Sequence, residues 1–172
     1  MTAILAGILI GIGDIALLTA ENKVVGALLF SVALLSIIRL RLPLYTGKIG
    51  KVIANRNPVE CLRILALNVV GVWIVRLYPV RIRSTAEAKF SRGYLELFVA
   101  GILCNILIHI AVTAKDNVIT ILCVMAFILA GFEHSIADSM YLAYNLPKWL
   151  VILAGNTVGG IGTELLLGKG RV

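Results

Sequence analysis

The sequence lacks the residue spacings that mark common metal and nucleotide sites. Its three cysteines, Cys61, Cys104 and Cys123, lie in or beside apolar stretches, are odd in number and form no CxxC pair, so we interpret them as free packing residues. No HExxH motif is present, and no lysine follows a GxxxxG in the spacing of a phosphate-binding loop. We therefore expect no metal, no nucleotide and no other cofactor.

Charged residues are also scarce, at 15% of the 172-residue chain, whereas hydrophobic residues make up 60% and the mean hydropathy is +1.00. A soluble domain cannot bury so much apolar surface, so lipid is the expected solvent. The net charge of +7 does not indicate nucleic acid, because Lys and Arg are scattered at the ends of apolar runs, where they suit lipid headgroups. We expect a multi-pass protein of the lipid bilayer with no nucleic-acid partner.

Successive apolar runs predict six spanning helices in one domain that covers residues 1–172. The runs are Ile4 to Ala20, Val24 to Ile38, Ile64 to Val75, Leu97 to Ala114, Val118 to Phe132 and Trp149 to Leu167. Several fall short of the roughly 20 residues that cross a bilayer, so flanking residues must extend them or some helices must break inside the membrane. The connections Glu21 to Lys23 and Lys115 to Asn117 are so short that the helices they join should be antiparallel neighbours.

Two polar, helix-breaking segments follow the second and fifth runs, Pro43 to Gly47 and Gly131 to Ser135. They occupy equivalent places in two three-span halves, as in an inverted repeat whose broken helices meet near the middle of the membrane. Because proline removes a backbone donor, we expect Leu44 to Gly47 to be non-helical and directed into the protomer. The predicted fold is an all-α, aquaporin-like integral membrane protein. Lys and Arg are equal in number on its two sides, so they do not orient it.

A few polar side chains lie within or directly after the apolar runs. Glu133 and His134 follow the fifth run without a loop, and a buried ionisable residue in a membrane is a candidate functional group, although a helix cap at the interface is the alternative. His109 is either a ligand or proton relay or a packed histidine. Side-chain amides inside spans either line a passage or bond a neighbouring helix. These amides belong to Asn68, Asn105 and Asn156.

Four segments occur in an order that resembles the formate/nitrite transporter family over nearly the whole chain. They are Leu44-Tyr45-Thr46-Gly47, Cys104-Asn105, Gly131-Phe132-Glu133-His134-Ser135-Ile136-Ala137 and Gly155-Asn156-Thr157-Val158-Gly159-Gly160. The resemblance implies a homopentamer of six-helix protomers in the cell (inner) membrane. Each protomer would hold its own narrow pore for a small monovalent weak-acid anion such as formate, nitrite, hydrosulfide or lactate.

The resemblance also assigns residues to that pore. It places the central histidine at His134, a nearby threonine at Thr46 and the pore asparagines at Asn105 and Asn156, beside the polar Glu133. Two hydrophobic constrictions would be formed by Phe30 with Phe127, and by Leu34, Leu44, Tyr45 and Ile108. A vestibule lysine would be Lys89.

This chain departs from the family pattern at several charged positions. Arg39 and Arg41 enter a stretch that is normally apolar or small, Asp138 stands where asparagine is usual, and Asp14 places a carboxylate in the first span. A lysine before the first span is missing, and Pro43 replaces an acidic residue. The new charges either compensate one another as ion pairs or indicate a changed solute.

The mechanism implied is passage of the neutral acid with a proton. A bare anion that loses its hydration costs tens of kcal/mol in an idealised low-dielectric medium. Protonating an acid of pKa about 3.9 at pH 7 costs only roughly 4 kcal/mol. A small neutral solute such as urea, ammonia or water, which would avoid the charge penalty, is the alternative. We do not expect an enzyme, because Glu133, His134 and His109 lack a metal-ligand spacing. A purely structural protein would not explain four ordered segments.

Overall fold

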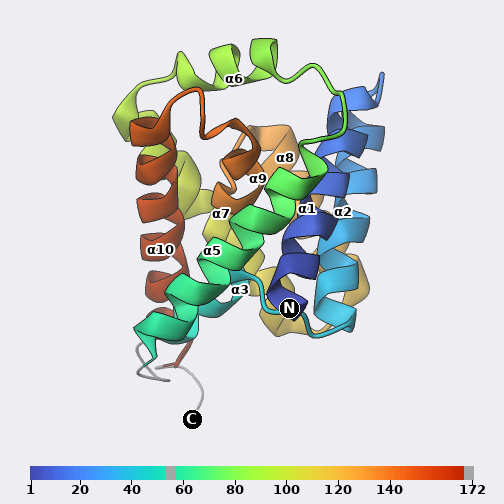
Figure 1. Cartoon of the computed structure of the whole chain (residues 1–172). Coiled ribbons are helices and arrows are strands. Elements are labelled where there is room, and N and C mark those ends of the chain that lie inside the picture. Colours follow the sequence, from blue (N-terminus) through green and yellow to red (C-terminus); the bar gives the residue numbers. More distant parts are fainter. Residues whose placement is uncertain (53–56, 169–172) are drawn as a thin grey trace.

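The computed structural model describes residues 1–52 and 57–168, and within these ranges all regular structure is helical (Figure 1). The elements in chain order are α1 (Thr2–Thr19), α2 (Lys23–Arg39), α3 (Tyr45–Lys48), η1 (Ile49–Lys51), α5 (Pro58–Val75), α6 (Arg83–Phe90), α7 (Tyr94–Ala114), α8 (Asn117–Ala130), α9 (Ser135–Asp138), η2 (Ser139–Tyr141) and α10 (Leu146–Gly168). The long helices stand side by side, and α6 lies across one end of them (Figure 1).

Four of these helices, α1, α5, α7 and α10, are long and apolar enough to cross a membrane. A fifth crossing is formed if α8 counts together with α9 and η2, which are bent from it by 52°. The helix α2, with 17 residues, is not among these candidates. Large apolar side chains such as Leu28, Val32 and Leu122 are exposed, as expected for helices that face lipid rather than water.

The two short hairpins predicted from the sequence are confirmed. Asn22 caps α2 by accepting hydrogen bonds from the backbone N–H groups of Val24 and Val25, and Asp116 caps α8 by accepting one from Ile119. Such caps satisfy donors that the first turn of a helix leaves free. As a result α1 packs against α2, and α7 packs against α8.

Glycines allow the closest helix approaches, between α1 and α5 and between α7 and α10. A Cβ atom built on Gly7 would lie 2.0 Å from the carbonyl oxygen of Asn68, and one built on Gly155 would lie 2.3 Å from that of Phe98. Small residues at these crossings let two backbones meet, which is how helices associate tightly where no hydrophobic effect separates protein from lipid. These two helix pairs frame the centre of the protein.

Two helix breaks lie between the long helices. The first follows α2, where Arg41 has a positive φ of 55° and Leu44 is extended. The second follows α8, where Gly131 has a positive φ of 74° and His134 is extended. The expectation that Leu44 to Gly47 is non-helical is wrong after Leu44, because the chain resumes a helical turn, α3, as soon as it has passed Pro43.

The first testable prediction concerns the α7–α10 contact. Gly155→Ala places a methyl group against a backbone oxygen that cannot move aside, so it should destabilise the protein by about 1–3 kcal/mol, as overpacking does. Gly162→Ala is the matched control on α10, because nothing lies within 4 Å of its Cβ position. That variant should be stabilised by about 0.5–1 kcal/mol. Thermal unfolding in detergent, with size-exclusion chromatography, checks both; equal midpoints would contradict the packing described.

Candidate functional site

The short helices α3 and α9 bring Thr46 and His134 together at the centre of the protein. The hydroxyl oxygen of Thr46 lies 2.9 Å from Nε2 of His134, and both side chains are buried. The two residues are 88 positions apart in the sequence. The pairing of the two breaks that the sequence predicted is therefore present as a direct side-chain hydrogen bond.

Asn68 on α5 holds the first break in place. Its side-chain oxygen accepts a hydrogen bond from the N–H of Tyr45, the first residue of α3, at 2.8 Å. Its side-chain nitrogen donates to the carbonyl oxygens of Ala3 at 2.7 Å and Pro43 at 3.1 Å. The amide thus bonds both sides of the break and the neighbouring helix α1. Asn68 could have lined a passage or bonded a neighbouring helix, and in the structure its amide bonds the neighbouring helix α1.

Asn156 on α10 does the same for the second break. Its oxygen accepts from the N–H of Ser135 at 2.7 Å, and its nitrogen donates to the carbonyl oxygens of Gly101 and Glu133, both at 2.8 Å. We expected a pore asparagine here, but both polar atoms of Asn156 already bond the backbone. The side chain sets the position of the residues on either side of His134.

His134 is held in one tautomer by its place at the start of α9. Its Nδ1 accepts a hydrogen bond from the N–H of Ala137 at 3.2 Å. Nδ1 therefore carries no proton, and the proton of the neutral ring is on Nε2, which donates to Thr46. In a protonated ring the Nδ1–H group would face the N–H of Ala137, and two donors cannot form a hydrogen bond with each other. His134 is therefore the helix cap that the sequence offered as one of its two alternatives, and it remains a candidate functional residue.

Asn105 on α7 differs from the other two asparagines. It is completely buried, and neither its side-chain nitrogen nor its oxygen has a hydrogen-bond partner in the part of the chain that the structure describes. Buried polar groups are nearly always bonded to protein or to ordered water. Of the residues assigned to the pore, Asn105 therefore has the side-chain amide that is available to a water molecule or a solute.

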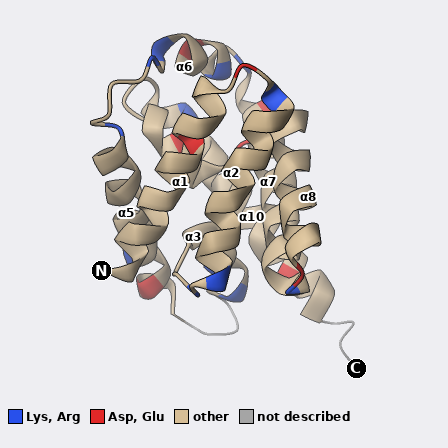
Figure 2. Cartoon of the chain, turned by 90° about the vertical axis from the view of Figure 1, so that its right-hand side faces the viewer, with Lys and Arg blue, Asp and Glu red and all other residues tan. Residues whose placement is uncertain are grey.

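Two cavities approach this centre from opposite ends of the bundle. The α3-side cavity, of about 540 Å³, is lined by residues of α2, α3 and the α7–α8 turn and includes Leu34 and Leu44. The α6-side cavity, of about 550 Å³, lies beneath α6 and includes Phe30, Phe127 and His134. Figure 2 shows basic residues at the end of α2 near α3, and an acidic residue of α1 beneath α6.

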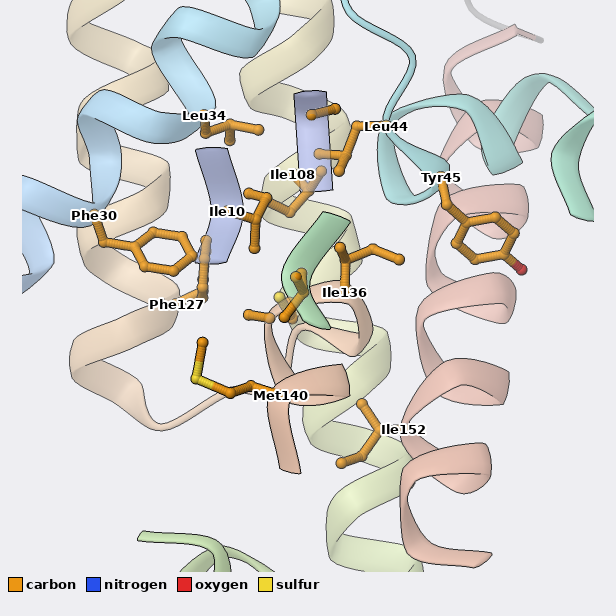
Figure 3. Packing of buried hydrophobic residues seen from close by; sticks show 14 of the residues in the cluster. Ile10, Phe30, Leu34, Leu44, Tyr45, Ile108, Phe127, Ile136, Met140 and Ile152 are labelled. Carbon is orange, nitrogen blue, oxygen red and sulfur yellow. The ribbon is translucent and has the colours of Figure 1, made fainter. Parts of the chain in front are cut away.

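Apolar side chains line both cavities: Leu34 and Leu44 line the α3-side cavity, and Phe30 and Phe127 line the α6-side cavity beside His134. The rings of Phe30 and Phe127 meet edge to face with centroids 6.1 Å apart, and Phe127 stacks on His134 at 6.0 Å. Leu34, Leu44 and Ile108 lie near one another on the other side and are almost fully buried (Figure 3). Phe30 and Phe127 thus form one apolar group, and Leu34, Leu44 and Ile108 form another.

Tyr45 does not lie with them. Its hydroxyl is 2.8 Å from that of Thr157 on α10, and its ring points away from Leu34 and Ile108 (Figure 3). The resemblance assigned Tyr45 to the constriction, but its side chain lies elsewhere. Tyr45 begins the helical turn α3, and a helical turn directs consecutive side chains to different faces.

Buried ion pairs fix the other end of the second break to α6. Lys89 forms ion pairs with Glu133 and with Asp138, the latter at 2.7 Å, while Arg92 contacts Glu133 at 2.6 Å. Burial lowers the pKa of Lys89, but Asp138 and Glu133 outweigh that effect and raise it above its usual range. Lys89 lines the α6-side cavity as a paired charge. Arg92 was not identified from the sequence. The available signal was that a buried Glu133 needs basic partners, and the basic segment 78–92 could supply more than one.

The charges in which this chain departs from the family pattern lie at opposite ends. Asp14 and Asp138 line the α6-side cavity, whereas Arg39 and Arg41 line the α3-side cavity. The two acidic and the two basic residues therefore do not pair with one another, and Asp138 instead pairs with Lys89. The Oδ2 atom of Asp14 has no hydrogen-bond partner within residues 1–52 and 57–168.

His109 lies away from this path. Its Nε2 is 3.0 Å from a carboxylate oxygen of Glu164 on α10, and its ring packs where a Cβ on Gly50 would stand. The residue lines neither of the two cavities. His109 is thus packed between α7 and α10, beside Glu164.

The broken helices, the apolar outer surface and the buried polar pair define a multi-pass membrane protein of the transporter class. The sequence profile of the formate/nitrite transporter family matches residues 1–169. The chain therefore belongs to the formate/nitrite transporter family, as the four ordered segments indicated.

Relatives of known function resemble the chain at low identity. The nitrite transporter NirC of Escherichia coli (strain K12) is 29% identical over 207 residues, covering 96% of this chain and 74% of that protein. The formate channel FocA of Haemophilus influenzae is 26% identical over 147 residues, covering 68% of this chain and 52% of that protein.

Two solved structures share the fold. An FNT family ion channel superposes with a TM-score of 0.86 at 24% identity, covering 99% of this chain and 89% of that one. A pentameric formate channel with formate bound superposes with a TM-score of 0.75 at 21% identity, covering 99% and 96%. The overall arrangement of helices is therefore the fold of this family.

The second prediction concerns Lys89. Lys89→Met leaves two buried carboxylates facing each other, so it should destabilise the protein by about 3–5 kcal/mol. Arg83→Gln, on the same helix, removes an exposed charge that pairs with the exposed Glu87 and should change stability little. Because folding raises the pKa of Lys89, the stability that its charge contributes is fully present below about pH 10.4, which is its pKa in the unfolded chain. That contribution should therefore be constant between about pH 7 and 9.

A double variant separates charge from packing. Lys89→Met with Asp138→Asn leaves Glu133 paired with Arg92, so thermal unfolding should recover most of the lost stability. A double variant no more stable than Lys89→Met would show that Lys89 acts through packing rather than through charge.

Proposed function

We propose that this protein is a channel for small monovalent weak-acid anions of the size of formate, nitrite or hydrosulfide, which cross as the neutral acid. The observation that supports this most directly is the buried Thr46–His134 pair, 2.9 Å apart, between two cavities that enter from opposite ends. A polar contact point between apolar constrictions suits a solute that sheds its water briefly. The relatives named as nitrite transporter and formate channel suggest the solute class.

The proposed architecture has six spans. In it α2 continues as α3 across the first break, as α8 continues as α9 across the second. The halves then correspond, with α1 and α7 in equal roles, and α5 and α10 each supplying the asparagine that holds a break. We propose a homopentamer in the inner membrane with one pore per protomer, after the similar pentameric formate channel.

The proposed solute path runs from one cavity to the other. From the α3-side cavity the solute passes Leu34, Leu44 and Ile108, then meets Thr46, His134 and the unbonded amide of Asn105. It leaves past Phe30 and Phe127 into the α6-side cavity. Each constriction excludes water, and the polar groups between them replace the hydrogen bonds that the solute loses.

His134 acts in this path as a neutral hydrogen-bond donor. Its Nδ1 is engaged by the N–H of Ala137, so only Nε2 is available to a solute. A solute that takes the place of Thr46 would receive the hydrogen bond from Nε2. This geometry favours hydrogen bonding over proton transfer through the ring, so we propose that the anion is protonated in a cavity before it reaches a constriction.

The third prediction tests the solute class. In sealed proteoliposomes formate, nitrite and hydrosulfide should enter faster when the outside is acidified, because the protonated form crosses, and dissipating the proton gradient should reduce accumulation. Urea and ammonia serve as neutral comparisons. If only urea or ammonia crosses, the proposed function is wrong while the fold is unaffected.

The fourth prediction concerns His134→Asn. Asparagine is a good helix N-cap, so α9 and the oligomer should be retained, as size-exclusion chromatography can check. The ring that donates to Thr46 and stacks on Phe127 is lost, so flux should fall roughly tenfold or more, the effect expected for about 1.4 kcal/mol or more of lost hydrogen bonding at the centre of the path. Wild-type flux for every solute, with an unchanged pH profile, would show that His134 is structural.

A further inference from the structure

The two cavities carry different charge. The α3-side cavity is lined by four basic residues and one acidic residue, Asp116. The basic residues are Arg39, Arg41, Lys48 and Lys115. The α6-side cavity is lined by three basic residues and three acidic residues. Its basic residues are Lys23, Lys89 and Arg92, and its acidic residues are Asp14, Glu133 and Asp138. The formal charge is thus strongly positive on the first side and balanced on the second.

The basic groups of the α6-side cavity are also engaged by other groups. Lys89 is shared between Glu133 and Asp138, and Arg92 contacts Glu133 and Glu96. The ammonium group of Lys23 lies 3.4 Å from the carbonyl oxygen of Leu129. A positive charge that is already neutralised by a buried carboxylate attracts an incoming anion weakly. The family resemblance assigned the vestibule lysine to Lys89, but its surroundings oppose a recruiting role.

The basic groups of the α3-side cavity are exposed, and none of the four forms an ion pair within residues 1–52 and 57–168. Arg39 donates a hydrogen bond to the neutral amide of Asn117 at 2.5 Å, which holds its guanidinium over the α7–α8 turn. The carboxylate of Asp116 accepts from the N–H of Ile119. Uncompensated positive charge therefore gathers at this mouth.

Arg41 has a backbone conformation that arginine seldom adopts. The N–H of Arg41 bonds the carbonyl of Ile38 and the N–H of Leu42 bonds that of Ile37, a helix ending that places Arg41 in the left-handed region at φ 55°. Glycine is the usual residue there. The corresponding ending of α8 has Gly131 at φ 74°. An arginine in a strained conformation that has a glycine counterpart indicates a function for its side chain.

We propose that the α3-side cavity, with Arg41 as its principal cation, is the site where this channel collects its anionic solute. This inference rests on the proposed function, since it assumes that the solute is an anion outside the membrane. The site lies directly in front of Leu34 and Leu44, which line its inner end. The channel is thereby asymmetric: an anion is concentrated at the α3-side mouth and meets a balanced charge at the α6-side mouth.

The test uses Arg41→Gly in the full-length protein. Glycine removes the charge and suits the left-handed backbone, so thermal unfolding should occur at the wild-type temperature or above it. In proteoliposomes of known orientation, the half-saturation concentration of nitrite or formate added on the α3 side should rise about fivefold at low ionic strength, equivalent to ~1 kcal/mol. From the α6 side it should change little.

Two further variants control for charge and position. Arg41→Lys keeps the charge and should stay within about twofold of wild type, because recruitment depends on charge rather than on guanidinium geometry. Arg63→Gln removes one charge from the first turns of α5, outside the α3-side cavity, and should leave the half-saturation concentration unchanged. Wild-type sensitivity to salt should be greater for solute added on the α3 side, since exposed charges are screened over about 10 Å at 0.1 M.

The outcomes distinguish this inference from the proposed function. Suppose that the wild-type protein carries formate or nitrite. The collecting site is then wrongly assigned if Arg41→Gly keeps the wild-type half-saturation concentration, or if Arg63→Gln has the same effect as Arg41→Gly. If wild-type protein carries urea or ammonia and no anion, the proposed function itself fails. A rise of similar size from both sides would overturn the asymmetry.

Discussion

The fold depends on satisfying the backbone groups that two helix breaks release inside an apolar bundle. An unbonded N–H or C=O group away from water costs several kcal/mol, so a broken helix persists there only if protein groups replace the lost bonds. Asn68 and Asn156 do this, each with one amide that accepts from the first N–H of a short helix and donates to two carbonyls. The breaks are therefore fixed to their neighbouring helices.

The functional centre follows from this arrangement. Because α3 and α9 are both held from outside by an asparagine, their first turns face each other, and Thr46 meets His134. The same turn of α9 supplies the N–H that keeps Nδ1 of His134 unprotonated. Lys89 and Arg92 neutralise Glu133, the residue before it, and so tie the break to α6. In the proposed path the histidine then presents one donor to a dehydrated solute without carrying a charge in the apolar centre.

The sequence predicted much of this and missed what depends on tertiary contacts. Apolar runs located the helices, short polar connections located the hairpins, and Pro43 and Gly131 located the breaks. The resemblance added Thr46, His134 and the Phe30–Phe127 contact. It could not distinguish Asn156, whose amide bonds the backbone, from Asn105, whose amide has no hydrogen-bond partner among the residues described, because both are asparagines in apolar helices. The direction of Tyr45 depended on the phase of a single helical turn. The pairing of Asp138 with Lys89, and the position of Arg41 on the α3-side cavity, depended on which end of the bundle each residue reaches.

A structure determined experimentally in a lipid nanodisc with saturating nitrite tests the central claim most directly. The account predicts density for the solute inside each protomer, within hydrogen-bond distance of Nε2 of His134 and displacing or bridging the hydroxyl of Thr46, with α3 and α9 held by Asn68 and Asn156 as described here. Density confined to a path between protomers, with the Thr46–His134 hydrogen bond intact and Phe30 and Phe127 sealing an empty centre, would contradict it.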